Sequence, residues 1–314
     1  MSRPRFERIL VAIAEPSAGM NKAVRRACAL ARKTRARIEL FSAIPSAVSA
    51  GIVHAQAEHF TRFEAEQSRR GLERTANRLR REDIVVDTNV QTGYPAHEAI
   101  LREVRLTAAD LVVIEARKHR VFARFLLTQT DFELIRRCPV PLLIVKGRTA
   151  WRSPRILAAL DPFHANDKPG ALDDDIVAAA RAVAAAVRGS VHAAHVYRPL
   201  MTYVPDMAMG AAMLAEIPVQ DKAYRSAVRR RFFAALDRYE ISRNKGHLVC
   251  GYPNEELPFL ARSMRAGLVV MGATSRSALQ RIFIGNTAEQ VLDSLRCDVL
   301  VVKPSSARGK RRRA

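Results

Sequence analysis

The fold is decided by the stretch Leu268-Val-Val-Met-Gly272-Ala-Thr-Ser-Arg-Ser-Ala-Leu-Gln-Arg-Ile-Phe-Ile-Gly285-Asn-Thr287. It begins with a short apolar run that ends on Gly272 and continues through a polar, basic loop to Gly285. A periodic segment then follows, so the pattern predicts a strand, a loop and a helix N-terminus. Backbone N–H groups at a helix start are unpaired and carry the positive end of the helix dipole, and glycine lets a phosphate approach the backbone. The stretch therefore predicts an anion-binding site.

The chain contains one unit twice. Ala109-Asp-Leu-Val-Val-Ile-Glu115 matches Ala266-Gly-Leu-Val-Val-Met-Gly272, and Leu142-Leu-Ile-Val-Lys146 matches Val299-Leu-Val-Val-Lys303, both at an offset of half the chain. We therefore expect a first domain over residues 1–148, a linker over 149–154 that contains glycine and proline, and a second domain over 155–306. A basic tail, residues 307–314, follows.

Each half alternates strands with helices, and several of the strands are continuous apolar runs. Such runs are typical of strands buried on both faces of a parallel sheet. The expected strands are Ile9–Ile13, Ile38–Ala43, Ile84–Val90, Leu111–Glu115 and Leu142–Val145, then Ile156–Leu160, Val191–Tyr197, His247–Cys250, Leu268–Met271 and Val299–Val302. The fold class is therefore α/β, with two tandem doubly wound domains, each a five-stranded parallel sheet flanked by helices. Ligands bind such sheets beyond the carboxyl ends of the strands, where the second half carries Asp161 and Gly272.

The composition narrows the class of protein. Hydrophobic residues make up 48% of the 314 residues, but no apolar run is long enough to span a membrane, and no signal peptide is visible, so we expect a cytoplasmic protein. The spacing of Cys28, Cys138, Cys250 and Cys297 fits free thiols better than a disulfide framework or a zinc site. The formal net charge of +21 attracts nucleotides, nucleic acids or anionic lipids, although a solvated basic surface explains it as well.

The segments Phe283–Pro304 and Thr128–Pro139, together with the repeat, resemble the universal stress protein family in its tandem, UspE-like form. The resemblance covers nearly the whole chain and implies the adenine-nucleotide α-hydrolase-like version of the α/β fold. It also implies that the two domains form a pseudo-dimer through their fifth strands. A further homodimer is left open by the sequence.

The family's nucleotide-binding members carry a glycine, two residues, a second glycine, nine residues, a third glycine and then Ser or Thr. Here the spacing is kept but two identities differ. The resemblance assigns the phosphate contacts to Gly272, Ser275 in place of the second glycine, Gly285, Asn286 in place of the hydroxyl residue, and Thr287, with Arg276 inside the loop as a further candidate. It assigns the adenine side to Asp161 and a main-chain contact to Val196. The implied ligand is ATP, accompanied by Mg²⁺, or another phosphorylated small molecule.

The first half departs further from this pattern. Glu115 stands at the position of Gly272, Thr128 at that of Gly285, and Ala14 at that of Asp161. A carboxylate at a phosphate loop repels phosphate, so we expect the first domain to be a structural partner without a nucleotide.

Several alternatives remain open from the sequence. The second domain could hydrolyse ATP weakly, but no catalytic set is visible at the loop. The chain could instead be an interaction protein without a nucleotide, or a nonspecific nucleic-acid binder through its basic surface. The run Asp173-Asp-Asp175 fits a helix start better than a metal site, and His192 and His195 should point to opposite faces of one strand. The Met-rich segment Pro199–Glu216 fits a lid or a packing segment.

Overall fold

The computed structural model describes residues 6–44, 54–116, 127–147, 150–163, 171–199, 211–273 and 286–304. Side chains are described in the same ranges, except those of residues 54–57, 171, 211–220 and 286–287. The basic tail, residues 307–314, lies outside this part of the chain.

The first domain contains five strands and four α-helices among its described residues. In chain order these are β1 (Arg8–Ala12), α1 (Lys22–Thr34), β2 (Arg37–Ile44), α2 (His54–Arg80), β3 (Val86–Thr92), α3 (Ala96–Leu106), β4 (Leu111–Glu115), α4 (Gln129–Arg137) and β5 (Leu142–Val145). The second domain repeats the order in its described part with β6 (Arg155–Ala159), α5 (Ala171–Val187), β7 (Ser190–Tyr197), α6 (Ala211–Arg238), β8 (Gly246–Cys250), α7 (Pro253–Ser263), β9 (Ala266–Gly272), α8 (Asn286–Ser294) and β10 (Asp298–Val302).

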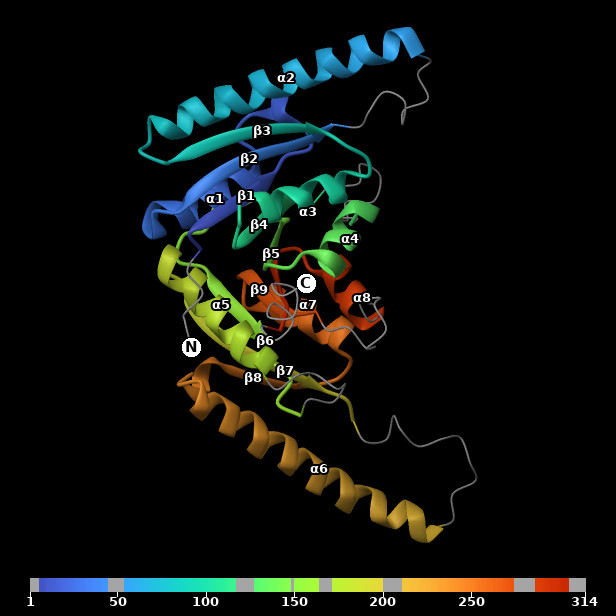
Figure 1. The fold of residues 1–314 in the computed structure, drawn as a ribbon. Coiled ribbons are helices and arrows are strands. Elements are labelled where there is room, and N and C mark those ends of the chain that lie inside the picture. The colour runs from blue at the N-terminus through green and yellow to red at the C-terminus, as the bar shows by residue number, and fades with distance from the viewer. Residues whose placement is uncertain are drawn as a thin grey trace.

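The strands form one ten-stranded sheet in the order β3-β2-β1-β4-β5-β10-β9-β6-β7-β8. Within each domain all neighbouring strands are parallel, whereas β5 and β10 pair antiparallel, with Leu300 opposite Leu143. The two predicted five-stranded sheets are therefore confirmed, and they are joined through the fifth strands. Figure 1 shows the result as an elongated molecule with α2 and α6 toward its two ends.

Helices cover both faces of the sheet. Helices α1, α2, α5 and α6 pack on one face and α3, α4, α7 and α8 on the other. Each face of the sheet has its own hydrophobic core, and alternate residues of a strand pack into different cores. In β10, Leu300 and Val302 belong to one core, and Val299 and Val301 to the other. All four of these side chains are buried, which explains why the strand is a continuous apolar run rather than an alternating one.

Two lysines cross the junction between the domains in a reciprocal way. The ammonium of Lys146, just after β5, donates to the carbonyl oxygens of Leu292 and Leu295 at the end of α8. The ammonium of Lys303, just after β10, donates to the carbonyl oxygens of Arg136 and Cys138 at the end of α4, at 2.6 and 2.7 Å. Each lysine thus caps the last helix of the other domain, where carbonyl groups lack helical partners and the dipole favours a cation.

A buried ion pair fixes the same junction. Asp298, at the start of β10, is fully buried, and its carboxylate lies 2.6 Å from Nε of Arg26 on α1. The same carboxylate accepts hydrogen bonds from the backbone N–H groups of Lys146 and Gly147 at 2.8 and 2.6 Å. On the opposite face, Arg136 of α4 pairs with Glu289 of α8 at 3.1 Å. The domains are therefore bound by charge and hydrogen bonds as well as by apolar packing.

Two helix starts bear on segments discussed from the sequence. Helix α6 begins at Ala211, inside the Met-rich segment expected to be a lid or a packing segment, because Ala, Met and Leu are strong helix formers. Asp173 and Asp174 lie in the first turn of α5, as predicted. The described part of the chain contains no group of three or more residues suited to a metal ion. All four cysteines are free thiols.

Candidate functional site

Three of the predicted site residues of the second domain, Asp161, Val196 and Gly272, lie at one edge of the sheet. Strands β6 and β9 are parallel neighbours, so Asp161, two residues beyond β6, and Gly272, the last residue of β9, both lie beyond the carboxyl ends. Val196 lies near the end of β7, opposite Val249 of β8, and is half-buried. Ser275, Arg276 and Gly285 lie outside the described residues, whereas Asn286 and Thr287 form the backbone start of α8.

Gly272 leaves room for a side chain from α5. A Cβ at this position would lie 2.5 Å from Cδ2 of Leu172, which is fully buried. A glycine therefore lets α5 lie close to the end of β9.

Gly272→Ala is expected to lower the free energy of unfolding by about 1–3 kcal/mol, because the added Cβ would overlap Cδ2 and Cγ of the fully buried Leu172 and force that side chain to shift. Urea denaturation measures this change. Gly93→Ala is the control. Its added Cβ would lie 3.3 Å from Cβ of Ala99, so this substitution should lower the free energy of unfolding by less. Equal losses in the two variants would mean that Leu172 is not confined.

The carboxylate of Asp161 faces no protein partner in the described part of the chain. Its backbone N–H donates to the carboxylate of Asp173 at 3.1 Å, which ties the chain after β6 to the first turn of α5. The Asp161 side chain itself is half-buried. Its position is thus fixed by the backbone contact to Asp173.

An aromatic cluster beside Asp161 was not predicted from the sequence. The buried ring of His195 donates from Nδ1 to the carbonyl oxygen of Leu160 at 3.0 Å. It stacks on Phe163 and Phe232 with ring centroids 5.7 and 6.4 Å away, and the guanidinium of Arg231 lies 4.8 Å from the Phe163 ring. His192, by contrast, contacts His247 of β8 at 3.2 Å. The two histidines of β7 therefore make separate contacts, and His195 holds the segment that carries Asp161.

The first domain uses its own carboxylates at the corresponding edge. Glu115, at the end of β4, accepts the backbone N–H of Lys22 at the start of α1 at 3.0 Å and pairs with the Lys22 ammonium at 3.1 Å. Asp131 accepts the backbone N–H of Thr128 at the start of α4 at 2.7 Å, within a capping box. Both helix N-termini therefore already bind an internal anion. Glu115 was expected to act by repelling phosphate. The structure shows in addition that its carboxylate is bound to the start of α1.

The second domain lacks the equivalent capping carboxylate. Ala288 stands in α8 at the repeat position of Asp131 in α4. The nearest acidic residue of the first turn, Glu289, is paired with Arg136. The start of α8 consequently has no carboxylate of its own at the capping position, which is the electrostatic difference between the two halves.

Comparison with known proteins agrees with this two-domain organisation. The model of the universal stress protein family matches residues 5–146 and again residues 155–303. Universal stress protein E of Escherichia coli K12 is 33% identical over 217 residues, which is 66% of this chain and 65% of that protein. The matched region thus spans just under two thirds of that relative's length. Universal stress protein E of Photorhabdus laumondii is 26% identical over 309 residues, 95% of each chain.

Solved structures agree with the fold. A putative universal stress protein from Pseudomonas aeruginosa UCBPP-PA14 superposes with a TM-score of 0.73 at 22% identity, covering 97% of this chain and 96% of that one. A functionally unknown protein from Pseudomonas aeruginosa PAO1 gives a TM-score of 0.72 at 23% identity, covering 97% and 95%. The chain belongs to the universal stress protein family, as a tandem two-domain member similar to universal stress protein E.

Proposed function

We propose that the chain is a stress-response protein whose second domain binds ATP, with Mg²⁺, beyond the carboxyl ends of β6 and β9. The observation that carries this proposal is the difference between the two helix N-termini. In the first domain Asp131 occupies the start of α4, whereas in the second domain the start of α8 has Ala288 at the same repeat position. A phosphate would supply the missing negative charge there.

The residues divide between the two ends of the nucleotide. Asp161 would accept hydrogen bonds from the ribose or the base, since its carboxylate has no partner among the described residues. The main chain near Val196 would border the base. The phosphates would meet the loop, with the assigned positions Gly272, Ser275, Arg276, Gly285, Asn286 and Thr287. Mg²⁺ would arrive with the nucleotide, because no protein cluster for a metal is present in the described ranges.

The proposal is for a binding protein rather than an enzyme. The proposal includes the cytoplasmic location that we expect from the sequence. Within the described residues no helix is long and apolar enough to cross a membrane.

The experiment is a thermal-shift titration with MgATP against inorganic phosphate at equal ionic strength. A ligand present at a hundred times its Kd stabilises the folded state by about 2.7 kcal/mol, so ATP should raise the Tm by several degrees and phosphate by less. Gly285→Asp places a carboxylate at the third glycine of the loop and should remove most of the shift.

The matched control is Thr128→Asp, the same change at the equivalent position of the first domain. Aspartate also serves as an N-cap, so α4 should persist and the shift with ATP should stay as in the wild type. Melting without ligand checks that both variants fold. A wild-type Tm that ATP leaves unmoved, or equal loss of the shift in both variants, would contradict the proposal.

A further inference from the structure

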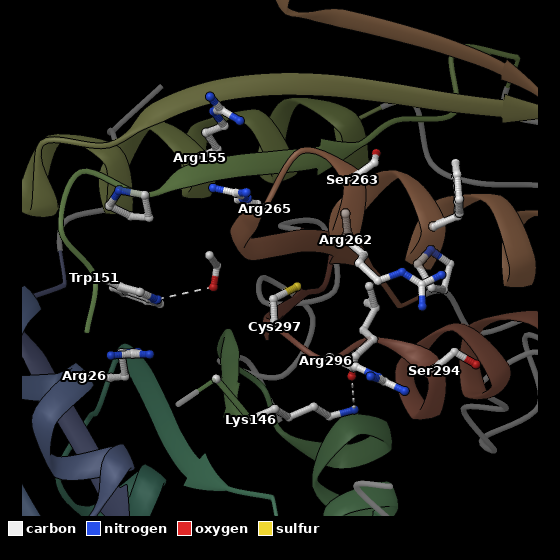
Figure 2. Close-up of a pocket in the computed structure, with 18 of the residues that line it drawn as sticks. Arg26, Lys146, Trp151, Arg155, Arg262, Ser263, Arg265, Ser294, Arg296 and Cys297 are labelled. Carbon is white, nitrogen blue, oxygen red and sulfur yellow. Dashed lines mark hydrogen bonds between the residues drawn. The ribbon is translucent and has the colours of Figure 1, made fainter. Parts of the chain in front are cut away.

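A cavity lies at the opposite edge of the sheet from Asp161 and Gly272. Its volume is about 1330 Å³, and it is lined by residues at the amino ends of β6, β9 and β10 together with Lys146 and Gly147 at the end of β5. Helix α7, the segment between α8 and β10, and the linker residues Ala150–Pro154 complete its walls. Figure 2 shows the side chains that surround it.

Positive charge dominates the lining of this cavity. It contains seven basic residues against two acidic ones, Glu255 and Asp293. Arg26 and Lys146 serve the junction between the domains, as described above. The other five are exposed arginines: Arg152, Arg155, Arg262, Arg265 and Arg296.

These five arginines have no carboxylate within ion-pair distance in the described part of the chain. Some surface arginines elsewhere are paired: on α2, Arg62 lies 3.5 Å from Glu58 and Arg70 lies 2.8 Å from Glu66. The cavity differs from an ordinary basic face because it gathers five arginines around one concave space, which strengthens the potential there.

The fold brings the arginines together from separate segments. Arg155 opens β6 beside Ala266 of β9, and its guanidinium donates to the carbonyl oxygen of Met264 at 2.7 Å. Arg265 adopts a left-handed conformation, with φ 52°, just after α7, so it lies next to Arg155. Arg262 reaches in from α7 and Arg296 from the turn before β10 (Figure 2).

Aromatic rings lie among these charges. The indole Nε1 of Trp151 donates to the carbonyl oxygen of Gly267 at 3.3 Å, and the guanidinium of Arg26 lies 4.8 Å from the ring centre. These two contacts hold the linker in place as one wall of the cavity. Phe259 is 59% exposed, with the Arg262 guanidinium 5.8 Å from its ring. The walls are therefore anchored, while the arginine heads remain accessible.

We propose that this cavity binds a small molecule that carries several adjacent phosphate groups. Guanidinium groups match phosphate oxygens in a bidentate manner, and several of them around one space require an anion of several charges. The cavity is concave and its walls come from both domains and the linker, which favours a small molecule over an extended polymer, and its volume leaves room for several phosphate groups. The site is separate from the proposed ATP site, because it lies at the other ends of the same strands.

The test is isothermal titration with inorganic tripolyphosphate at physiological salt. It uses the full chain with Gly285→Asp, so that the loop of the proposed ATP site contributes nothing. Within it, Arg262→Gln with Arg296→Gln should weaken binding by about tenfold or more, since each removes charge-assisted hydrogen bonds. Arg74→Gln with Arg102→Gln, two exposed arginines on α2 and α3 outside the cavity, removes the same charge and should change the affinity less than about twofold.

Each outcome is decisive. Equal losses in the two pairs of variants would attribute binding to net charge and overturn the proposal, as would no binding of tripolyphosphate. An RNA oligonucleotide that displaces tripolyphosphate and depends on Arg262 and Arg296 would overturn the choice of a small ligand. Unchanged melting temperatures without ligand confirm folding. ATP binding that Gly285→Asp leaves unchanged and that Arg262→Gln with Arg296→Gln removes would contradict the proposed function but leave this result unaffected.

Discussion

Replacing Asp298 with alanine is expected to lower the free energy of unfolding by about 3–5 kcal/mol. The carboxylate is fully buried, and it accepts hydrogen bonds from three donors: Arg26 Nε at 2.6 Å and the backbone N–H groups of Lys146 and Gly147. Without it the Arg26 guanidinium, whose side chain is 7% exposed, loses its ion pair. A buried charge left without its counter-charge is among the costliest defects that a single substitution creates.

The loss should appear as a lower urea midpoint with an unchanged m-value. Asp110→Ala is the matched control. Its carboxylate also binds backbone N–H groups, those of Glu7 and Arg8, at 2.7 and 3.2 Å, but no ion pair in the described part of the chain involves it. Asp110→Ala should lower the free energy of unfolding by about 1–3 kcal/mol. If Asp298→Ala cost no more than Asp110→Ala, the Arg26 pair would not stabilise the junction.

Lys146 is expected to make the protein gain stability as the pH rises from about 8 to 10.5, relative to Lys146→Met. Burial is the main cause that lowers the pKa of Lys146 from 10.5 to about 8, against the opposing influence of Asp293. Between these values the unfolded chain holds the proton and the folded chain has released it. Raising the pH therefore favours the folded state across this window, by at most about 3 kcal/mol.

Urea denaturation of both proteins at several pH values measures this difference. Methionine keeps most of the length of the lysine side chain without its charge, so the comparison isolates the ammonium. Below pH 8 the amine is protonated in both states, and the difference between the two proteins should be constant. A difference that also stays constant between pH 8 and 10.5 would show that Lys146 keeps its proton in the fold.

The sequence predicted the fold because the repeat and the apolar runs report on local structure. Leu142–Lys146 and Val299–Lys303 match each other, and both segments became fifth strands followed by a capping lysine. The role of the two lysines could not be predicted, since each caps a helix more than a hundred residues away.

The candidate site was predictable in part. Asp161 and Gly272 could be placed because strand ends in a parallel sheet meet at one edge. The binding of Glu115 to the start of α1 depends on how that helix packs, which spacing does not encode. The arginine cavity was missed for a similar reason. Its residues come from separate segments, and in the sequence they are indistinguishable from the other basic residues of a chain with a net charge of +21.

The central claim is that one of two homologous domains binds ATP and the other does not. Equilibrium dialysis against labelled MgATP tests it most directly, because it counts bound nucleotides. The full chain carries Arg262→Gln and Arg296→Gln, so that the arginine cavity does not add to the count. We expect one ATP per chain, since Glu115 and Asp131 already occupy the helix N-termini of the first domain. Saturation at two ATP per chain, or no binding, would contradict the claim.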